Sequence, residues 1–273
     1  MDTLNATYEE RKEIAKKTCI VIGSDMSVDD IKSIELLHKS LWRAVENPAD
    51  LFVATYAWAF SFQEFTDKGI RLISARNALY ELGFHDSKFR GESPAKIAFI
   101  GIPVIKALEG YDRMIVLKPN EVILSKDFEY LYRVPMQGYS VIGHSDGRET
   151  PTNTNFYAMT TPGEKEFIQA TWDENPPWFR NRLCDRVVIM DLKKIREDLQ
   201  GYKHNCTTFF EMCHRAVSDI RSTSFCDIFM DSGVILPNCV SQQGWDGDCR
   251  CLVSAYDQNE GGFKWVADRF LLK

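Results

Sequence analysis

The sequence predicts an α/β fold with a mostly parallel central sheet flanked by helices. Apolar runs of strand length alternate with segments of helical period over residues 17–124, and polar or glycine-containing turns separate them. An apolar content of 44% in 273 residues is enough for a large core. Alternation of this kind favours parallel strands joined by right-handed crossovers.

The first strand is expected over residues 17–22, and it ends in the turn Gly23-Ser24-Asp25. A helix follows, with Ser27 or Asp25 as its N-cap. Its apolar residues recur at helical spacing: Val28, Ile31, Ile34, Leu37, Leu41 and Val45. Asn47-Pro48 ends this helix. Strands are then predicted over 51–55 and 70–74, with a short helix over 63–68 between them.

A helix over about 94–108 leads to a buried strand at 114–117. The same apolar character resumes at 122–124, after Lys118-Pro119-Asn120. Proline cannot donate to a sheet ladder, so this triplet should lie at the carboxyl end of the strand. That edge is where open α/β sheets bind ligands. Ser125 is then expected to cap a short helix over 127–133.

The second half is less regular. Strands are predicted over 139–143 and 153–160, with a helix over 163–172, and a strand–helix unit is predicted over 186–194.

Charge and composition exclude several classes of partner. The net charge is −6, and no block of Lys and Arg exceeds two residues, which argues against nucleic acid as a partner. No apolar run approaches a membrane span, and the first residues lack the apolar core of a signal peptide. We therefore expect a cytoplasmic protein without a membrane span. Its eight cysteines form no CxxC pair, which argues against a zinc site. Their even number would permit disulfides in a secreted protein, but without a signal peptide reduced thiols are expected.

The segment Tyr111-Asp-Arg-Met-Ile-Val-Leu-Lys-Pro-Asn-Glu-Val-Ile-Leu124 resembles the strand and metal motif of nucleotide-sugar glycosyltransferases of the glycogenin-like class, family 8. This resemblance implies a GT-A-type fold over a single domain, 1–273. It further implies a nucleotide-binding half at 17–124 and an acceptor-side half at 125–273. The implied reaction transfers a sugar from a nucleotide-sugar donor to the hydroxyl of a sugar or protein acceptor, with retention of anomeric configuration.

The family's metal site is altered in this chain. Two aspartates of the family motif hold Mn²⁺ against the donor diphosphate, and Lys118 and Asn120 occupy their positions. The family's C-terminal histidine ligand has no counterpart, because all five histidines precede residue 215. The family thus implies Mn²⁺, but its ligands are not preserved. Three interpretations stay open: Lys118 neutralises the diphosphate itself, the protein is an inactive binding or scaffold protein, or Lys118 is a solvated strand-end lysine.

Other segments resemble further parts of the family. Gly23-Ser24-Asp25 matches the loop that cups the nucleotide, although the aromatic that commonly stacks on uracil is replaced by Ser27. The resemblance implies donor contacts by Gly23, Ser24, Asp25, Lys96, Lys118, Asn120 and Asn153. Asn153 begins a strand that carries such contacts in the family, but 186–194 is an alternative counterpart of that strand. Asp248, in a segment similar to the family's "wdGDQGllN" motif, would face the reacting sugars, with Asp231 as the rival placement.

Overall fold

The computed structural model describes residues 6–24, 26–55, 63–75, 102–145, 183–203, 232–234, 241–243, 252–256 and 258–266. They form a seven-stranded sheet in the order β3-β2-β1-β4-β7-β6-β8. Its strands are β1 (Thr18–Ser24), β2 (Asp50–Thr55), β3 (Arg71–Ser74), β4 (Arg113–Leu117), β6 (Val141–Ser145), β7 (Leu183–Asp191) and β8 (Ser232–Val234). The predicted α/β fold with a mostly parallel sheet is confirmed.

Strands β1 to β4 of the main sheet are parallel to one another, as the alternating pattern predicts. From the second half, β7 joins this sheet antiparallel to both β4 and β6, and β8 pairs parallel to β6. Strands from both halves of the chain therefore share one hydrogen-bonded sheet.

A second, three-stranded sheet lies beside the first. It has the order β5-β10-β9, with β5 (Glu121–Ile123), β10 (Val253–Ala255) and β9 (Ser241–Gln243). The apolar run predicted to resume at 122–124 is thus a strand, but of this smaller sheet. Its partner β10 comes from the far end of the chain, which local periodicity cannot reveal.

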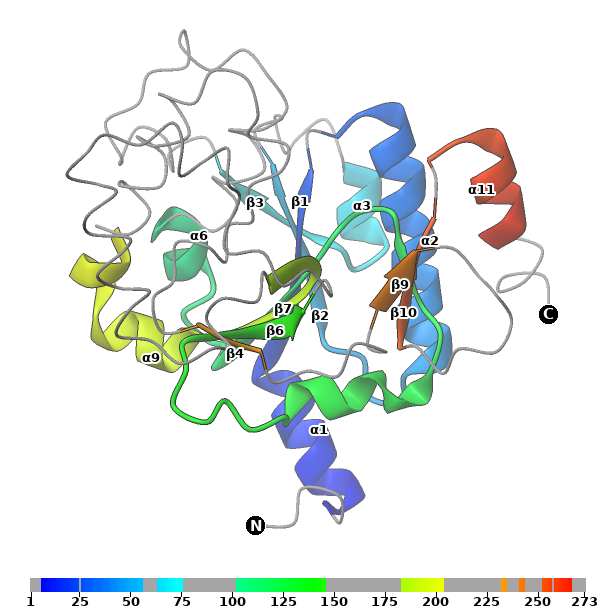
Figure 1. The fold of residues 1–273 in the computed structure, drawn as a ribbon. Helices are drawn as coiled ribbons and strands as arrows, with labels where there is room; N and C mark the ends of the chain where they lie inside the picture. Colours follow the sequence, from blue (N-terminus) through cyan, green and yellow to red (C-terminus); the bar gives the residue numbers. More distant parts are fainter. Residues whose placement is uncertain are drawn as a thin grey trace, which may run out of the picture.

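Helices cover both faces of the main sheet (Figure 1). In that view α2 (Val28–Ala44), α3 (Gln63–Asp67) and α11 (Glu260–Val266) lie on one side, and α6 (Ile102–Ala107) and α9 (Leu192–Glu197) lie on the other. Two further helices lie at the lower end of the view, α1 (Tyr8–Lys16) and the 3₁₀ helix η4 (Lys126–Tyr132). Sequence reasoning did not predict α1, whose capping box pairs Thr7 with Glu10.

The long helix α2 begins at its predicted N-cap and buries part of its predicted apolar stripe. Ser27 caps it by accepting from the Asp30 N–H at 3.2 Å, as predicted. Within its apolar stripe, Ile34, Leu37 and Leu41 are fully buried in the same core as Ile20 and Ile22 of β1, whereas Val28 at the start of the helix is exposed. Alternate residues of β1 therefore lie in the core that α2 covers.

The predicted boundaries differ in places. Of the helix predicted over 94–108, the described residues form helix only over Ile102–Ala107. The short helix predicted after Ser125 is a 3₁₀ helix, and the Ser125 hydroxyl accepts from the Asp127 N–H at 3.1 Å. The predicted elements over 153–160 and 163–172 lie outside the described residues.

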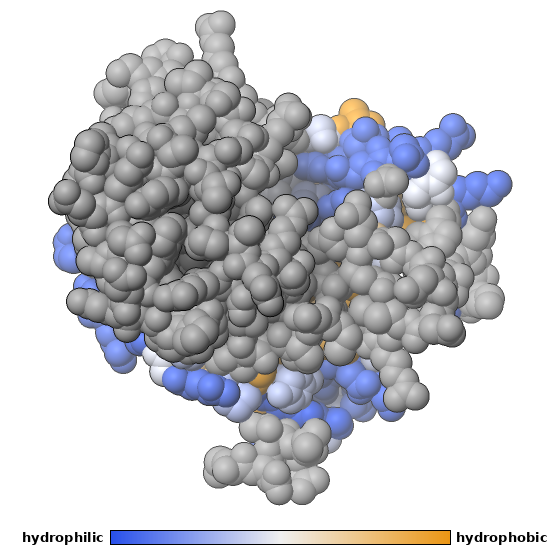
Figure 2. All heavy atoms as spheres, in the orientation of Figure 1, coloured by the Kyte–Doolittle hydropathy of each residue, from blue (hydrophilic) through white to orange (hydrophobic). Residues whose placement is uncertain are grey.

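The described surface is largely polar. In Figure 2 its coloured part is mostly blue, with small separated patches of orange. Among the described residues, the large apolar side chains that are exposed are Tyr8, Val28 and Trp42. No described helix is long and apolar enough to cross a membrane.

Candidate functional site

The carboxyl ends of the parallel strands form one edge of the main sheet, which we call the carboxyl edge. Ser24 pairs with Thr55, and Thr55 pairs with Ser74, so three hydroxyl residues end β1, β2 and β3 side by side. Ile22 pairs with Leu117, which places the following residues, Gly23 and Lys118, next to each other at this edge. The structure thus brings Gly23, Ser24 and Lys118 together at this edge.

The Ser24 side chain shapes the turn that leaves β1. It is 2% exposed; its hydroxyl donates to Asp30 Oδ2 at 2.7 Å and accepts from the Met26 N–H at 2.9 Å. Met26 has a φ of +62°, a left-handed conformation that costs energy for a residue with a side chain. The serine hydrogen bonds hold this strained turn in place, so Ser24 acts on the shape of the loop.

The first turn of α2 carries negative charge at the carboxyl edge. Asp29 and Asp30 both lie in that turn, where their carboxylates already complement the positive end of the helix dipole. These carboxylates would repel a diphosphate, which makes this helix terminus a poor phosphate site. Counter-charge for an anion must come from elsewhere on the edge.

Lys118 supplies such a charge. It follows β4 directly and its side chain is exposed. Its main-chain N–H donates to Glu121 Oε2 at 2.9 Å, which closes the turn around Pro119. Its ammonium forms no ion pair with any other residue in the described ranges. The cation is therefore free to meet an anionic ligand at the strand end.

Asn120 makes a different kind of contact. Its side-chain Nδ2 donates to the Tyr256 carbonyl at 2.8 Å, and its own carbonyl accepts from the Tyr256 N–H at 3.1 Å. Residue 256 follows β10, so this paired contact joins the turn after β4 to the C-terminal strand. The amide nitrogen is thus committed within the protein.

The C-terminal segment also forms hydrogen bonds with α2. Gln258 Nε2 donates to Asp30 Oδ1 at 2.7 Å and to Ser33 Oγ at 3.1 Å. Tyr256 is 4% exposed, and burial, followed by the nearby Asp30 charge, raises the pKa of its phenol to about 12. Tyr256 packs with Val122, Val266 and Phe263 in a small second core. This segment forms one side of the carboxyl edge.

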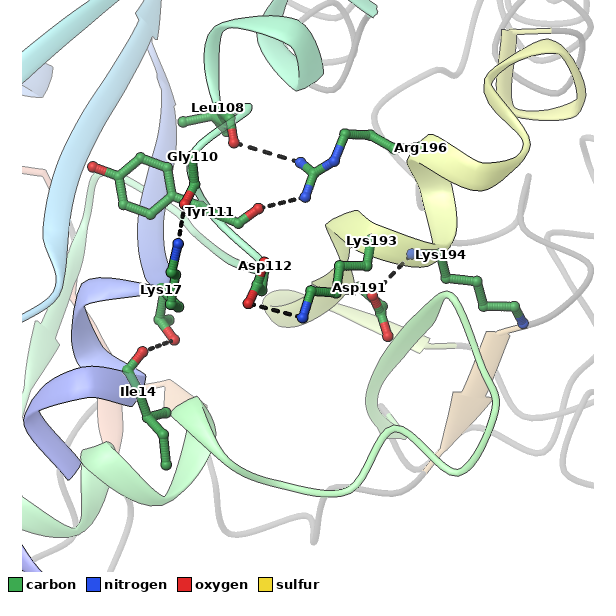
Figure 3. A network of polar contacts seen from close by, with 11 residues as sticks. Ile14, Lys17, Leu108, Gly110, Tyr111, Asp112, Asp191, Lys193, Lys194 and Arg196 are labelled. Carbon is green, nitrogen blue, oxygen red and sulfur yellow. Dashed lines mark hydrogen bonds and ion pairs between the residues drawn. The ribbon is translucent and has the colours of Figure 1, made fainter. Parts of the chain in front are cut away.

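The opposite edge of the sheet has its own polar network (Figure 3). Arg196 of α9 donates to the carbonyls of Tyr111 at 2.6 Å and Leu108 at 3.5 Å, and Lys17 donates to the Gly110 carbonyl. Cations therefore satisfy carbonyl groups at the end of α6. Lys193 pairs with Asp112 at 3.0 Å. Asp191 pairs in register with Arg113, so these residues lie at the amino end of β4, away from Lys118.

This network gives a stability prediction. Arg196→Met removes two charge-assisted hydrogen bonds from half-buried groups, and we expect the free energy of unfolding to fall by about 1.5 kcal/mol. The matched control is Lys193→Met, whose exposed ion pair should be worth less than about 1 kcal/mol. Urea denaturation followed by circular dichroism measures both. Equal losses in the two variants would contradict the assignment of a capping role to Arg196.

No protein-family model matches the sequence, and no curated protein matches it. Solved structures do match. The galactosyltransferase LgtC, in complex with donor and acceptor sugar analogues, aligns with a TM-score of 0.55 and 9% identity, over 94% of this chain and 97% of that one. The bifunctional glycosyltransferase WbbM aligns with a TM-score of 0.54 and 12% identity, over 88% of this chain and 45% of that one. The chain has a GT-A glycosyltransferase fold.

Mouse xyloside xylosyltransferase 1 also matches, with a TM-score of 0.50 and 10% identity, over 88% of this chain and 96% of that one. At these identities the likeness shows the GT-A fold alone. The chain spans less than half of WbbM, and nearly all of LgtC's length is matched.

The described residues at the carboxyl edge do not fit a divalent metal bound in the way the family resemblance implies. A lysine ammonium repels a dication, and the Asn120 amide nitrogen faces a carbonyl within the protein. Within the described part of this GT-A chain, no group of three or more His, Cys, Asp or Glu side chains is placed to hold a metal ion. No step of the proposed chemistry is therefore assigned to Mn²⁺.

Four predicted site residues, Asp25, Lys96, Asn153 and Asp248, lie outside the described residues of the GT-A chain, as does the alternative Asp231. Sequence reasoning missed Thr55 and Ser74, although both are the last residues of predicted strands. It also missed the edge position of Arg186. This residue precedes Val187, the partner of Leu117 in β7, and its backbone therefore reaches the carboxyl edge beside Lys118.

Proposed function

We propose that this protein transfers a sugar from a nucleotide-sugar donor to a hydroxyl acceptor, and that Lys118 takes the place of the metal at the donor diphosphate. The observation that carries the proposal is the exposed ammonium of Lys118 at the carboxyl edge of a GT-A sheet, with no anionic partner among the described residues. The segment 111–124 resembles the glycogenin-like class of glycosyltransferases, and we propose that the chain belongs to this class, family 8.

The chemistry follows from charge. When the bond between the sugar and the diphosphate breaks, negative charge grows on the leaving phosphate oxygen, and a cation near that oxygen lowers the barrier. A lysine ammonium supplies one full charge and three N–H donors without a metal. Lys118 lies next to Gly23. Because glycine has no side chain, the main chain at Gly23 can also approach the same ligand closely.

The remaining assignments complete this proposal. Residues 17–124 form the donor half and 125–273 the acceptor half. Asp25, Lys96 and Asn153 contact the donor, and Asp248 faces the reacting sugars. The acidic first turn of α2 suits the neutral hydrogen-bond donors of a ribose or base better than phosphate. Ser24 and Asn120 shape the edge around the donor.

A second candidate is a non-catalytic protein that binds a nucleotide or serves as a scaffold. It is favoured by the same altered motif, because the Asn120 amide is used for internal structure and no acid pair stands in the triplet. Binding without turnover would distinguish this function from sugar transfer.

Calorimetric titration tests the proposal. UDP, GDP and UDP-glucose are added to the protein in EDTA and, separately, in Mn²⁺. We expect at least one to bind with a dissociation constant below about 1 mM, equally well in EDTA and in Mn²⁺. Slow release of free sugar from UDP-glucose would support an enzyme over a scaffold. Binding that needs Mn²⁺ would contradict the role of Lys118, and absence of binding to every probe would contradict both functions.

A further inference from the structure

The turn after β4 and the C-terminal strand meet in a contact that resembles one rung of a sheet. In antiparallel sheets, two residues of a hydrogen-bonded pair exchange N–H···O bonds in both directions. Asn120 and Tyr256 exchange two bonds, but the donor from Asn120 is its side-chain Nδ2 and not its main-chain N–H. The asparagine side chain therefore extends the ladder of β5 and β10 by one rung.

The ladder that it extends is short. β10 pairs with β5 over three residues only, from Val253↔Ile123 to Ala255↔Glu121. At the far end the Leu124 N–H donates to the Leu252 carbonyl at 2.9 Å. With so few rungs, one added hydrogen bond is a large share of the ladder that joins β10 to β5. Beyond this strand, Gln258 reaches Asp30, which in turn accepts from Ser24 in the first loop.

We infer that Asn120 is a positioning residue, which fixes the C-terminal segment (252–256 and 258) as one wall of the candidate site. The segment then holds Asp30, and through it the turn at Ser24. An aspartate at position 120, as in the family motif, has no N–H to donate and would place a carboxylate against the Tyr256 carbonyl. This contact therefore requires asparagine, and the Asn120 amide nitrogen is not available to bind the nucleotide-sugar.

Hydrogen exchange with mass spectrometry tests this inference on the full chain, with Asn120→Asp and Asn120→Leu and the matched control Lys118→Gln. Loss of one hydrogen bond should make the amides of residues 252–256 exchange about five- to tenfold faster in both Asn120 variants. Amides of β1 and β4 should stay protected, and Lys118→Gln should leave the segment unchanged.

A change of pH separates positioning from a general loss of structure. A protonated aspartic acid can donate an O–H to the Tyr256 carbonyl, so lowering the pH from 7 to about 4 should restore part of the protection in Asn120→Asp. Asn120→Leu should show no such recovery, and because it keeps every other titratable group, it corrects for their effects. Equal behaviour of the two variants at both pH values would overturn the inference.

UDP binding provides the functional readout, and this part rests on the proposed function. Both Asn120 variants should bind UDP about five- to tenfold more weakly than the natural chain. If the natural chain binds no nucleotide, the proposed function fails while the exchange data still decide the inference. Unchanged protection of residues 252–256 in both variants would overturn the inference even where UDP binds.

Discussion

Lys118→Glu is expected to weaken UDP binding at least 100-fold. The substitution replaces the Lys118 cation by an anion, so attraction for the diphosphate becomes repulsion. Removing a charged hydrogen-bond partner costs about 1.5–3 kcal/mol, and reversing its charge costs more, because two unit charges 4 Å apart interact by about 4 kcal/mol near a protein surface. Calorimetry in low salt measures the change directly.

Lys126→Glu is the control for this variant. Lys126 is also exposed and carries the same charge, but it lies in η4, on the far side of β5 from Lys118. The two variants change the net charge of the protein by the same amount. A similar loss of UDP affinity in both would show that the effect arises from overall charge and would contradict a specific site at Lys118.

Phe128→Ala is expected to lower the free energy of unfolding by about 3–5 kcal/mol. The Phe128 ring is fully buried in the main core. It packs edge to face against the Tyr132 ring, with 5.9 Å between the ring centroids. Its helix η4 also holds the loop before β2, because Glu129 accepts from the Asn47 N–H at 2.7 Å and the Tyr132 hydroxyl accepts from the Ala49 N–H at 3.2 Å. A cavity under η4 therefore disturbs several contacts together.

Thermal or urea denaturation measures this loss, and Trp42→Ala is the control. Trp42 is a large aromatic residue, but 62% of it is exposed on α2. Its removal should change the free energy of unfolding by no more than about 0.5 kcal/mol. If Phe128→Ala costs no more than Trp42→Ala, the packing of η4 described above is wrong.

Local sequence signals predict much of the first half of the fold. Helix α2 is confirmed at its N-cap and along its buried stripe, because Ser27 and the spacing of Ile34, Leu37 and Leu41 act within one element. The parallel strands β1 to β4 follow from the same short-range alternation. Their carboxyl edge then places Gly23, Ser24 and Lys118 together without any further information.

What sequence reasoning could not supply are contacts between distant segments. The β10 strand joins β5 across about 130 residues, and nothing in the three residues Val253–Ala255 specifies that partner. The contact of Asn120 with Tyr256 depends on this pairing, so pattern alone could not predict this internal hydrogen bond. Similarly, β7 runs antiparallel to β4, so Lys193 and Lys194, which follow β7, lie at the edge opposite Lys118.

The central claim is that the Lys118 ammonium binds the donor diphosphate in place of a metal. The most direct measurement compares the affinities of UDP and uridine, in EDTA, for the natural chain and for Lys118→Met. The claim predicts that UDP binds the natural chain at least about tenfold more tightly than uridine does, and that Lys118→Met loses this preference while uridine binding is unchanged. A preference for UDP that survives in Lys118→Met would contradict it.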